Sequence, residues 1–135
     1  MQFAQVCDRV EASAGEINRT PLLGTWINSN VDTNSIARVK ISEANGKLQL
    51  QVFAMGPDGL IDWGTSDAQV FAAGPSSHAG AGFTCRYDFG FAEARLQAMI
   101  MKGLLVLAQF HLFKDDSGRA DYFLREYFAL SHDRF

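Results

Sequence analysis

Two spacings of apolar residues divide the chain. Residues 3–14 place an apolar side chain at every third or fourth position, the spacing of one face of an amphipathic helix. The residues of that face are Phe3, Val6, Cys7, Val10 and Ala14. From Leu22 onward the period falls to two and a turn recurs roughly every ten residues, which is typical of an all-β sandwich or barrel. The pattern predicts a short helix and linker over residues 1–20 and a β-barrel domain over residues 21–135.

Eight strands are expected, joined mostly by short turns. Asn45-Gly46 favours the positive φ angles of a tight hairpin, and Pro57-Asp58-Gly59 combines a fixed φ with a glycine. The expected strands cover residues 22–29, 36–42, 47–55, 60–72, 83–89, 91–101, 104–113 and 121–130. A sheet built from consecutive hairpins removes its free edges by closing on itself. The predicted fold is therefore an all-β, eight-stranded antiparallel up-and-down β-barrel.

The two strands at 104–113 and 122–130 carry apolar residues on both faces. A barrel wall normally places polar side chains outside, so this apolar excess needs a cover. Either the N-terminal helix or another copy of the chain can supply it. A homodimer or a larger symmetric homo-oligomer is the expectation.

Composition and charge exclude several classes of partner. A chain of 135 residues is long enough for one domain with its own core. The net charge of −3 and the pI near 5.5 leave no broad basic surface, so no nucleic acid is expected as a partner. The N-terminus lacks the pattern of a secretory signal, and no apolar stretch is long enough to cross a membrane. We expect a cytoplasmic protein with no membrane partner.

Cysteine and histidine are sparse. The two cysteines and three histidines show no ligand spacing, which predicts neither a disulfide framework nor a metal site. No cofactor is expected.

The segment Gly24-Thr25-Trp26-Ile27-Asn28 resembles the first strand of calycins, which opens with Gly-x-Trp in lipocalins and continues in a similar way in avidin-type barrels. The resemblance covers this motif and the rhythm of strands over residues 22–130. It implies a small barrel in which the glycine permits close approach of strands and the tryptophan plugs one end. It also implies that an arginine of the last strand, here Arg125, packs across Trp26.

The avidin resemblance places Asn28 where those barrels use an asparagine to bind biotin. Avidins line that pocket with several tryptophans, whereas this chain has only Trp26 and Trp63. Biotin is therefore not the expected ligand.

An eight-stranded barrel has room for side chains or for one small ligand, in a pocket that is mainly apolar with a few polar groups. The expected ligand-binding residues are Asn28, Trp63, Tyr87, Gln109, His111 and Tyr127. Trp63 is either a platform for the ligand or a ring that packs the barrel rim. His111 is either a general acid or base, since its pKa is easily moved, or a hydrogen-bonded core histidine.

The last strand allows two registers. One register turns Phe123, Arg125 and Tyr127 inward. The other turns inward Tyr122, Leu124, Glu126 and Phe128.

Three functions fit these residues. The leading one is binding of a small, mostly apolar organic molecule inside the barrel. The second is a cofactor-free cyclase or isomerase of natural-product biosynthesis, with His111, Tyr87 and Glu126 as catalytic residues. The third is a protein-interaction or protease-inhibitor module, which requires the N-terminal twenty residues to be mobile. The sequence alone leaves open whether the protein is an enzyme.

Overall fold

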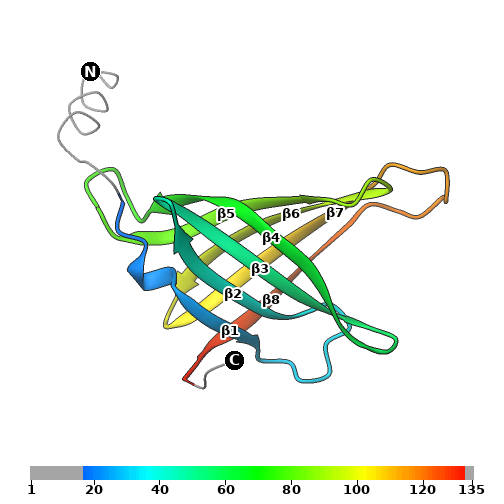
Figure 1. Cartoon of the computed structure of the whole chain (residues 1–135), viewed down its shortest axis with the longest axis horizontal. Coiled ribbons are helices and arrows are strands. Elements are labelled where there is room, and N and C mark those ends of the chain that lie inside the picture. Colours follow the sequence, from blue (N-terminus) through cyan, green and yellow to red (C-terminus); the bar gives the residue numbers. More distant parts are fainter. Residues whose placement is uncertain (1–16, 133–135) are drawn as a thin grey trace, which may run out of the picture.

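Each strand pairs with the next one along the chain, and the last strand pairs with the first, so that the sheet closes into a barrel (Figure 1). The computed structural model describes residues 17–132. All pairings are antiparallel, which confirms the predicted eight-stranded up-and-down barrel. The strands are β1 (Gly24–Asn28), β2 (Ile36–Ala44), β3 (Lys47–Gly56), β4 (Gly59–Ala72), β5 (Gly80–Asp88), β6 (Ala92–Met101), β7 (Leu104–Phe113) and β8 (Tyr122–Ser131).

Two strands begin two or more residues away from the predicted position. The first strand begins at Gly24, because Thr20–Leu22 form a 3-10 turn, η1, with Pro21 near its start. The fifth strand begins at Gly80, whose backbone N–H donates to the carbonyl of Asn18 at 2.7 Å. The helix expected over residues 3–14 lies outside the described residues.

One end of the barrel is closed by η1 and Trp26. Leu22 is fully buried, and the indole Nε1 of Trp26 donates to its carbonyl at 3.0 Å. Trp26 is therefore buried at this end of the barrel. The expectation for Arg125 is wrong, because this side chain is exposed on the outer face of β8. Arg19 lies at the closed end instead, where it donates to the carbonyl of Gly46 and forms an ion pair with Glu43.

Side chains fill the interior next to this closed end. The largest that are fully buried include Phe83, Phe128, Leu50, Leu96, Leu105 and Leu107. Burying each of these side chains contributes about 1.5–3 kcal/mol to the free energy of folding. Burial of Phe128 also fixes the register of β8: Leu124, Glu126 and Phe128 point inward.

No helix among residues 17–132 is long and apolar enough to cross a membrane.

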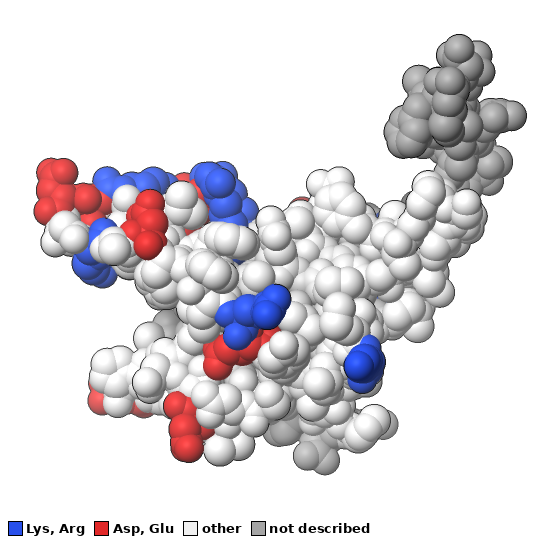
Figure 2. Space-filling view, turned by 180° about the vertical axis from the view of Figure 1, so that it is seen from behind, with Lys and Arg blue, Asp and Glu red and all other residues white. Residues whose placement is uncertain are grey.

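The outer wall over β6, β7 and β8 is largely apolar. Viewed from behind, the molecule shows a broad surface on which Lys, Arg, Asp and Glu are sparse (Figure 2). The outward side chains of β7 are all apolar: Leu104, Val106, Ala108, Phe110 and Leu112. Five of the eight apolar residues of this strand thus face outward.

Candidate functional site

The barrel end opposite η1 is open, and four connections surround it (Figure 1). A cavity of about 510 Å³ lies at this end, and we call it the mouth cavity. Its lining is dominated by rings, with one arginine and one aspartate at the edge. The lining residues are Ile61, Asp62, Trp63, Phe89, Phe91, Ala92, His111, Phe113, Arg119 and Tyr122.

A β-bulge directs Trp63 into the mouth cavity. Gln51 pairs with Thr65 and Phe53 pairs with Asp62, so Trp63 and Gly64 together oppose a single residue of β3. Gly64 adopts a φ of +84°, which side chains rarely tolerate. Its N–H donates to the Asp62 carboxylate at 2.7 Å. Further along β4 the even-numbered positions face the core, and the extra residue shifts this alternation so that Trp63 faces inward.

Three aromatic rings pack edge-to-face against the indole of Trp63. The centroid distances are 5.5 Å to Tyr87, 5.0 Å to Phe89 and 6.3 Å to His111. Edge-to-face contacts of this kind are each worth about 0.5–1.5 kcal/mol beyond the area they bury. Trp63 is therefore held in place by the neighbouring rings while it lines the cavity.

The hydroxyl of Tyr87 is engaged by the barrel wall. It donates toward the carbonyl oxygens of Leu50 and Gly64, at 3.1 and 3.0 Å. Burial raises the pKa of this phenol, so the hydroxyl stays protonated. Tyr87 thus stabilises the bulge beneath Trp63, and its oxygen does not line the mouth cavity.

His111 is fixed from two sides. Its ring stacks on Tyr122 at a centroid distance of 4.6 Å, and its Nε2 lies 3.0 Å from Oε1 of Gln109. Because an amide oxygen can only accept, Nε2 carries the proton. Burial lowers the pKa of His111, which keeps the imidazole neutral near pH 7. The site therefore presents a neutral histidine.

Gln109 is the fully buried support below His111. Its Oε1 also accepts a hydrogen bond from the Ser35 hydroxyl at 3.1 Å. Its Nε2 has no hydrogen-bond partner among residues 17–132. Gln109 thus joins the loop after β1 to the wall of the mouth cavity, and it positions His111 rather than lining the cavity.

Arg119 lies at the rim of the mouth cavity. Its guanidinium lies 4.3 Å from the ring centroid of Phe113 and 5.4 Å from that of Phe91. It also donates to Asp115 at 2.8 Å. Cation–π contact and an ion pair together hold a positive charge where a ligand would enter.

Glu126 lines a second, more polar hollow beside the mouth cavity, and Asn28 lies at the end of β1, just before the loop that forms part of this hollow. Glu126 lines this hollow of about 390 Å³ and accepts a hydrogen bond from the Thr33 hydroxyl. Asn28 is buried and bonds backbone groups of the same loop, donating to the Ile36 carbonyl and accepting from the Asn30 N–H. Asn28 therefore shapes the loop between β1 and β2, and Glu126 lies apart from Tyr87.

Tyr127 is outside the barrel. Its side chain is 43% exposed on the outer face of β8, between inward-facing neighbours. The expectation that Tyr127 binds a ligand in the interior is wrong, because this side chain faces outward. The strand carries apolar residues on both faces, so its register could not be predicted from the sequence.

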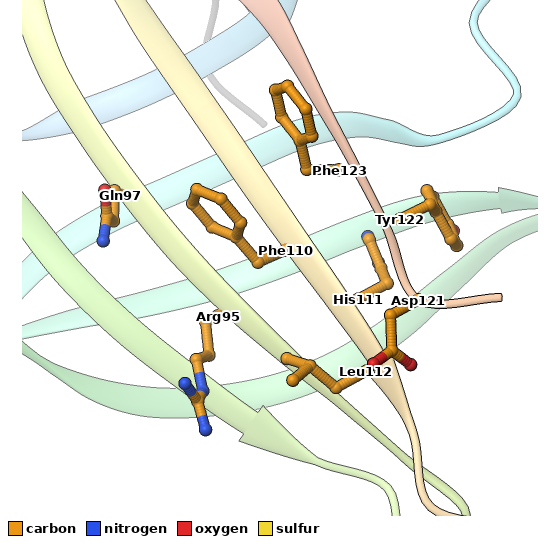
Figure 3. A pocket seen from close by; sticks show the side chains of 8 residues that line it. All are labelled: Arg95, Gln97, Phe110, His111, Leu112, Asp121, Tyr122 and Phe123. Carbon is orange, nitrogen blue, oxygen red and sulfur yellow. The ribbon is translucent and has the colours of Figure 1, made fainter.

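A third hollow, of about 440 Å³, lies on the outer wall, and we call it the outer groove (Figure 3). Phe110 and Phe123 project together on one side of β7 and β8, while Tyr122 projects on the other (Figure 3). Arg95, Gln97, Leu112 and Asp121 complete the lining with parts of His111.

Eight of the ten residues that line the mouth cavity were not among the predicted site residues: Ile61, Asp62, Phe89, Phe91, Ala92, Phe113, Arg119 and Tyr122. The sequence did contain a signal for this aromatic lining. In an up-and-down barrel, the connection between the fifth and sixth strands and the connection between the seventh and eighth strands lie at the same end. Aromatic residues flank both of these connections.

The arrangement can enclose a flat apolar molecule and offer it a neutral imidazole and a guanidinium. Among the described residues, no group of three or more His, Cys, Asp or Glu side chains is placed to hold a metal ion. Comparisons of the chain with protein-family models, curated proteins and solved structures give no match.

Proposed function

We propose that this barrel binds a small, flat, mostly apolar organic molecule in the mouth cavity. The observation that carries the proposal is the aromatic lining: Trp63, Phe89, Phe91, Phe113, Tyr122 and His111 surround a space of about 510 Å³. This volume lies within the roughly 300–1,000 Å³ range of small-molecule sites. Rings on several sides favour a ligand with a planar, conjugated body.

Two polar groups would orient the ligand. The protonated Nε2 of His111 is held by Gln109, which leaves Nδ1 of the neutral ring as an acceptor. Arg119 at the rim favours a ligand whose exposed end carries partial or full negative charge. A mainly apolar body with one polar end fits both groups.

Fluorescence titration with anilinonaphthalene sulfonate, a flat aromatic anion, tests the proposal. Trp63→Ala removes the central ring of the cavity and is expected to weaken binding about tenfold, the effect of losing a central aromatic contact. Val31→Ala is the control, because this side chain is 90% exposed and lines neither the mouth cavity nor the outer groove. Equal loss in both variants, or no loss in Trp63→Ala, would contradict the proposal.

Catalysis has weaker support than binding. The three residues expected to act together are separated: the Tyr87 hydroxyl bonds wall carbonyls, and Glu126 lines the neighbouring hollow. His111 alone of the three lines the mouth cavity. A cyclase or isomerase would therefore have to rely on one neutral imidazole and on the shape of the cavity.

The protein-interaction alternative requires a mobile N-terminal segment. Within the described residues the segment from Asn18 to Leu22 is docked: Asn18 pairs with Ala79, and Leu22 is fully buried. This docking gives the inhibitor hypothesis less support than ligand binding.

A further inference from the structure

The outside of β6, β7 and β8 carries many exposed apolar side chains, interrupted by Arg95, Gln97 and Arg125, and we call it the outer apolar face. Neighbouring strands place its side chains in rows, such as Met99, Val106 and Tyr127, or Arg95, Phe110 and Phe123. Several members are well exposed: Met99 47%, Met101 50%, Leu104 37%, Phe110 37%, Phe123 68% and Tyr127 43%. Monomeric proteins rarely expose so many large apolar side chains together.

We propose that the outer apolar face is the interface of a homodimer, occupied by the same face of a second copy of this chain. The proposal goes beyond ligand binding and does not depend on it, because the mouth cavity opens at the barrel end and the face lies on the barrel wall.

The size of the face suits a dimer. At about 3.3 Å per residue and about 4.8 Å between strands, a surface ten residues long and three strands wide covers roughly 500 Å² in projection. Side-chain relief adds accessible area, and Ile27 and Phe71 extend the apolar rows on either side. A stable interface buries about 800 Å² per partner. The face therefore approaches what one half of a dimer needs.

Projecting rings and a hollow lie side by side on the face. Phe110 and Phe123 stack at a centroid distance of 5.8 Å and form a ridge that is one wall of the outer groove. In a twofold interface every contact between the copies occurs twice, so the ridge of each copy can enter the groove of its partner.

The charged residues of the outer apolar face also favour a homodimer. Arg125 is exposed between Phe123 and Tyr127, and no ion pair joins it to another of the described residues. Asp121 lines the outer groove at one end of the face. The face thus carries Arg95 and Arg125 together with Asp121, so charges of opposite sign can meet across a twofold interface. A membrane surface fits less well, since anionic lipids attract clusters of basic residues and this chain has a net charge of −3.

The test is the solution mass of the full chain by light scattering across a range of concentrations. The wild type is expected at twice the chain mass of 14.9 kDa. Phe123→Asp places a charge on the ridge and is expected to give a monomer with an unchanged circular dichroism spectrum. Val31→Asp is the matched control, because Val31 is 90% exposed away from the face, and this variant should remain a dimer.

A second variant keeps the test decisive if Phe123→Asp does not fold. Tyr127 lies two residues beyond Arg125 on the same face of β8. Tyr127→Asp places a charge there and should also give a folded monomer. A monomeric wild type at about 100 μM, well above the dissociation constants typical of specific complexes, would overturn the proposal. Folded face variants that remain dimeric would overturn it as well. So would binding of the wild type to anionic vesicles that Phe123→Asp abolishes while both proteins are monomeric.

Discussion

His111 and Tyr122 lie flat against each other across the pair of strands β7 and β8. Their ring centroids are 4.6 Å apart and their planes differ by 7°. The two residues are direct partners in the register of these strands. Together with the bond to Gln109, this stacking leaves the imidazole one orientation on the wall of the mouth cavity. The polar group of the site is therefore positioned before any ligand arrives.

The neutral state of His111 predicts a pH-dependent stability. Burial lowers the pKa of this imidazole below its ordinary value of 6.5 in the folded protein. When pH falls through about 6.5, the unfolded chain binds a proton that the folded chain resists, so the free energy of unfolding decreases. His111→Gln should flatten this part of the profile. Urea unfolding at several pH values between about 5 and 7 measures it.

His132→Gln is the control for the pH experiment, since His132 is an exposed histidine outside the barrel strands. It should leave the profile unchanged. An identical acid-side slope in the wild type and His111→Gln would show that the imidazole is not held neutral by the fold.

Gly64→Ala is predicted to weaken both stability and ligand binding. The φ of +84° is unfavourable for alanine, while the added Cβ meets no atom within 4 Å, so the cost of about 1–2 kcal/mol is conformational. Relief of this strain would shift the bulge and Trp63 with it. Unfolding curves and titration with anilinonaphthalene sulfonate measure the two effects.

Gly103→Ala separates them. Gly103 has a φ of +80° and the same open surroundings, but it lies in the turn between β6 and β7, at the opposite end of the barrel from the mouth cavity. It should lose similar stability and keep its affinity. If both variants bind equally well, the bulge does not control the position of Trp63.

Tyr87→Phe should lower stability and spare the affinity for the dye. The lost hydroxyl leaves the carbonyls of Leu50 and Gly64 without this donor, at a cost of about 1–2 kcal/mol. Thermal unfolding together with the dye titration checks both parts. A large loss of affinity without a loss of stability would give Tyr87 a direct role in binding.

Arg119→Met is predicted to discriminate between charged and neutral ligands. Affinity for anilinonaphthalene sulfonate should fall about two- to fivefold, the effect of an exposed charge worth up to about 1 kcal/mol. Affinity for neutral N-phenylnaphthylamine should hold, because methionine preserves apolar contact with Phe113 and Phe91. The difference should shrink in high salt. Equal losses for the two dyes would assign Arg119 a packing role.

The period of two and the chemistry of the turns are local properties, and they sufficed to predict the number, order and approximate ends of all eight strands. The register of β8 was not predictable in this way, because residues 122–130 are apolar on both faces and alternation loses its meaning there. Burial of Phe128 and exposure of Tyr127 come from closure against β1.

The candidate site was predicted in part. Of the residues predicted to bind a ligand, Trp63 and His111 line the mouth cavity, and Gln109 lies next to it and contacts His111. Asn28 and Tyr87 have side-chain polar groups that are engaged by backbone partners, which sequence patterns do not show. Arg119 comes from a connection whose folding over Phe113 depends on a long-range contact between an arginine and two rings.

The most direct test of the binding site uses the two tryptophan side chains of this protein, labelled with ¹⁵N at the indole. Trp26 is buried at the closed end of the barrel, and Trp63 lines the mouth cavity. On titration with anilinonaphthalene sulfonate, the indole resonance of Trp63 should shift and saturate while that of Trp26 stays in place. A Trp63 resonance that does not move while the dye binds elsewhere on the protein would contradict a ligand site in the mouth of the barrel.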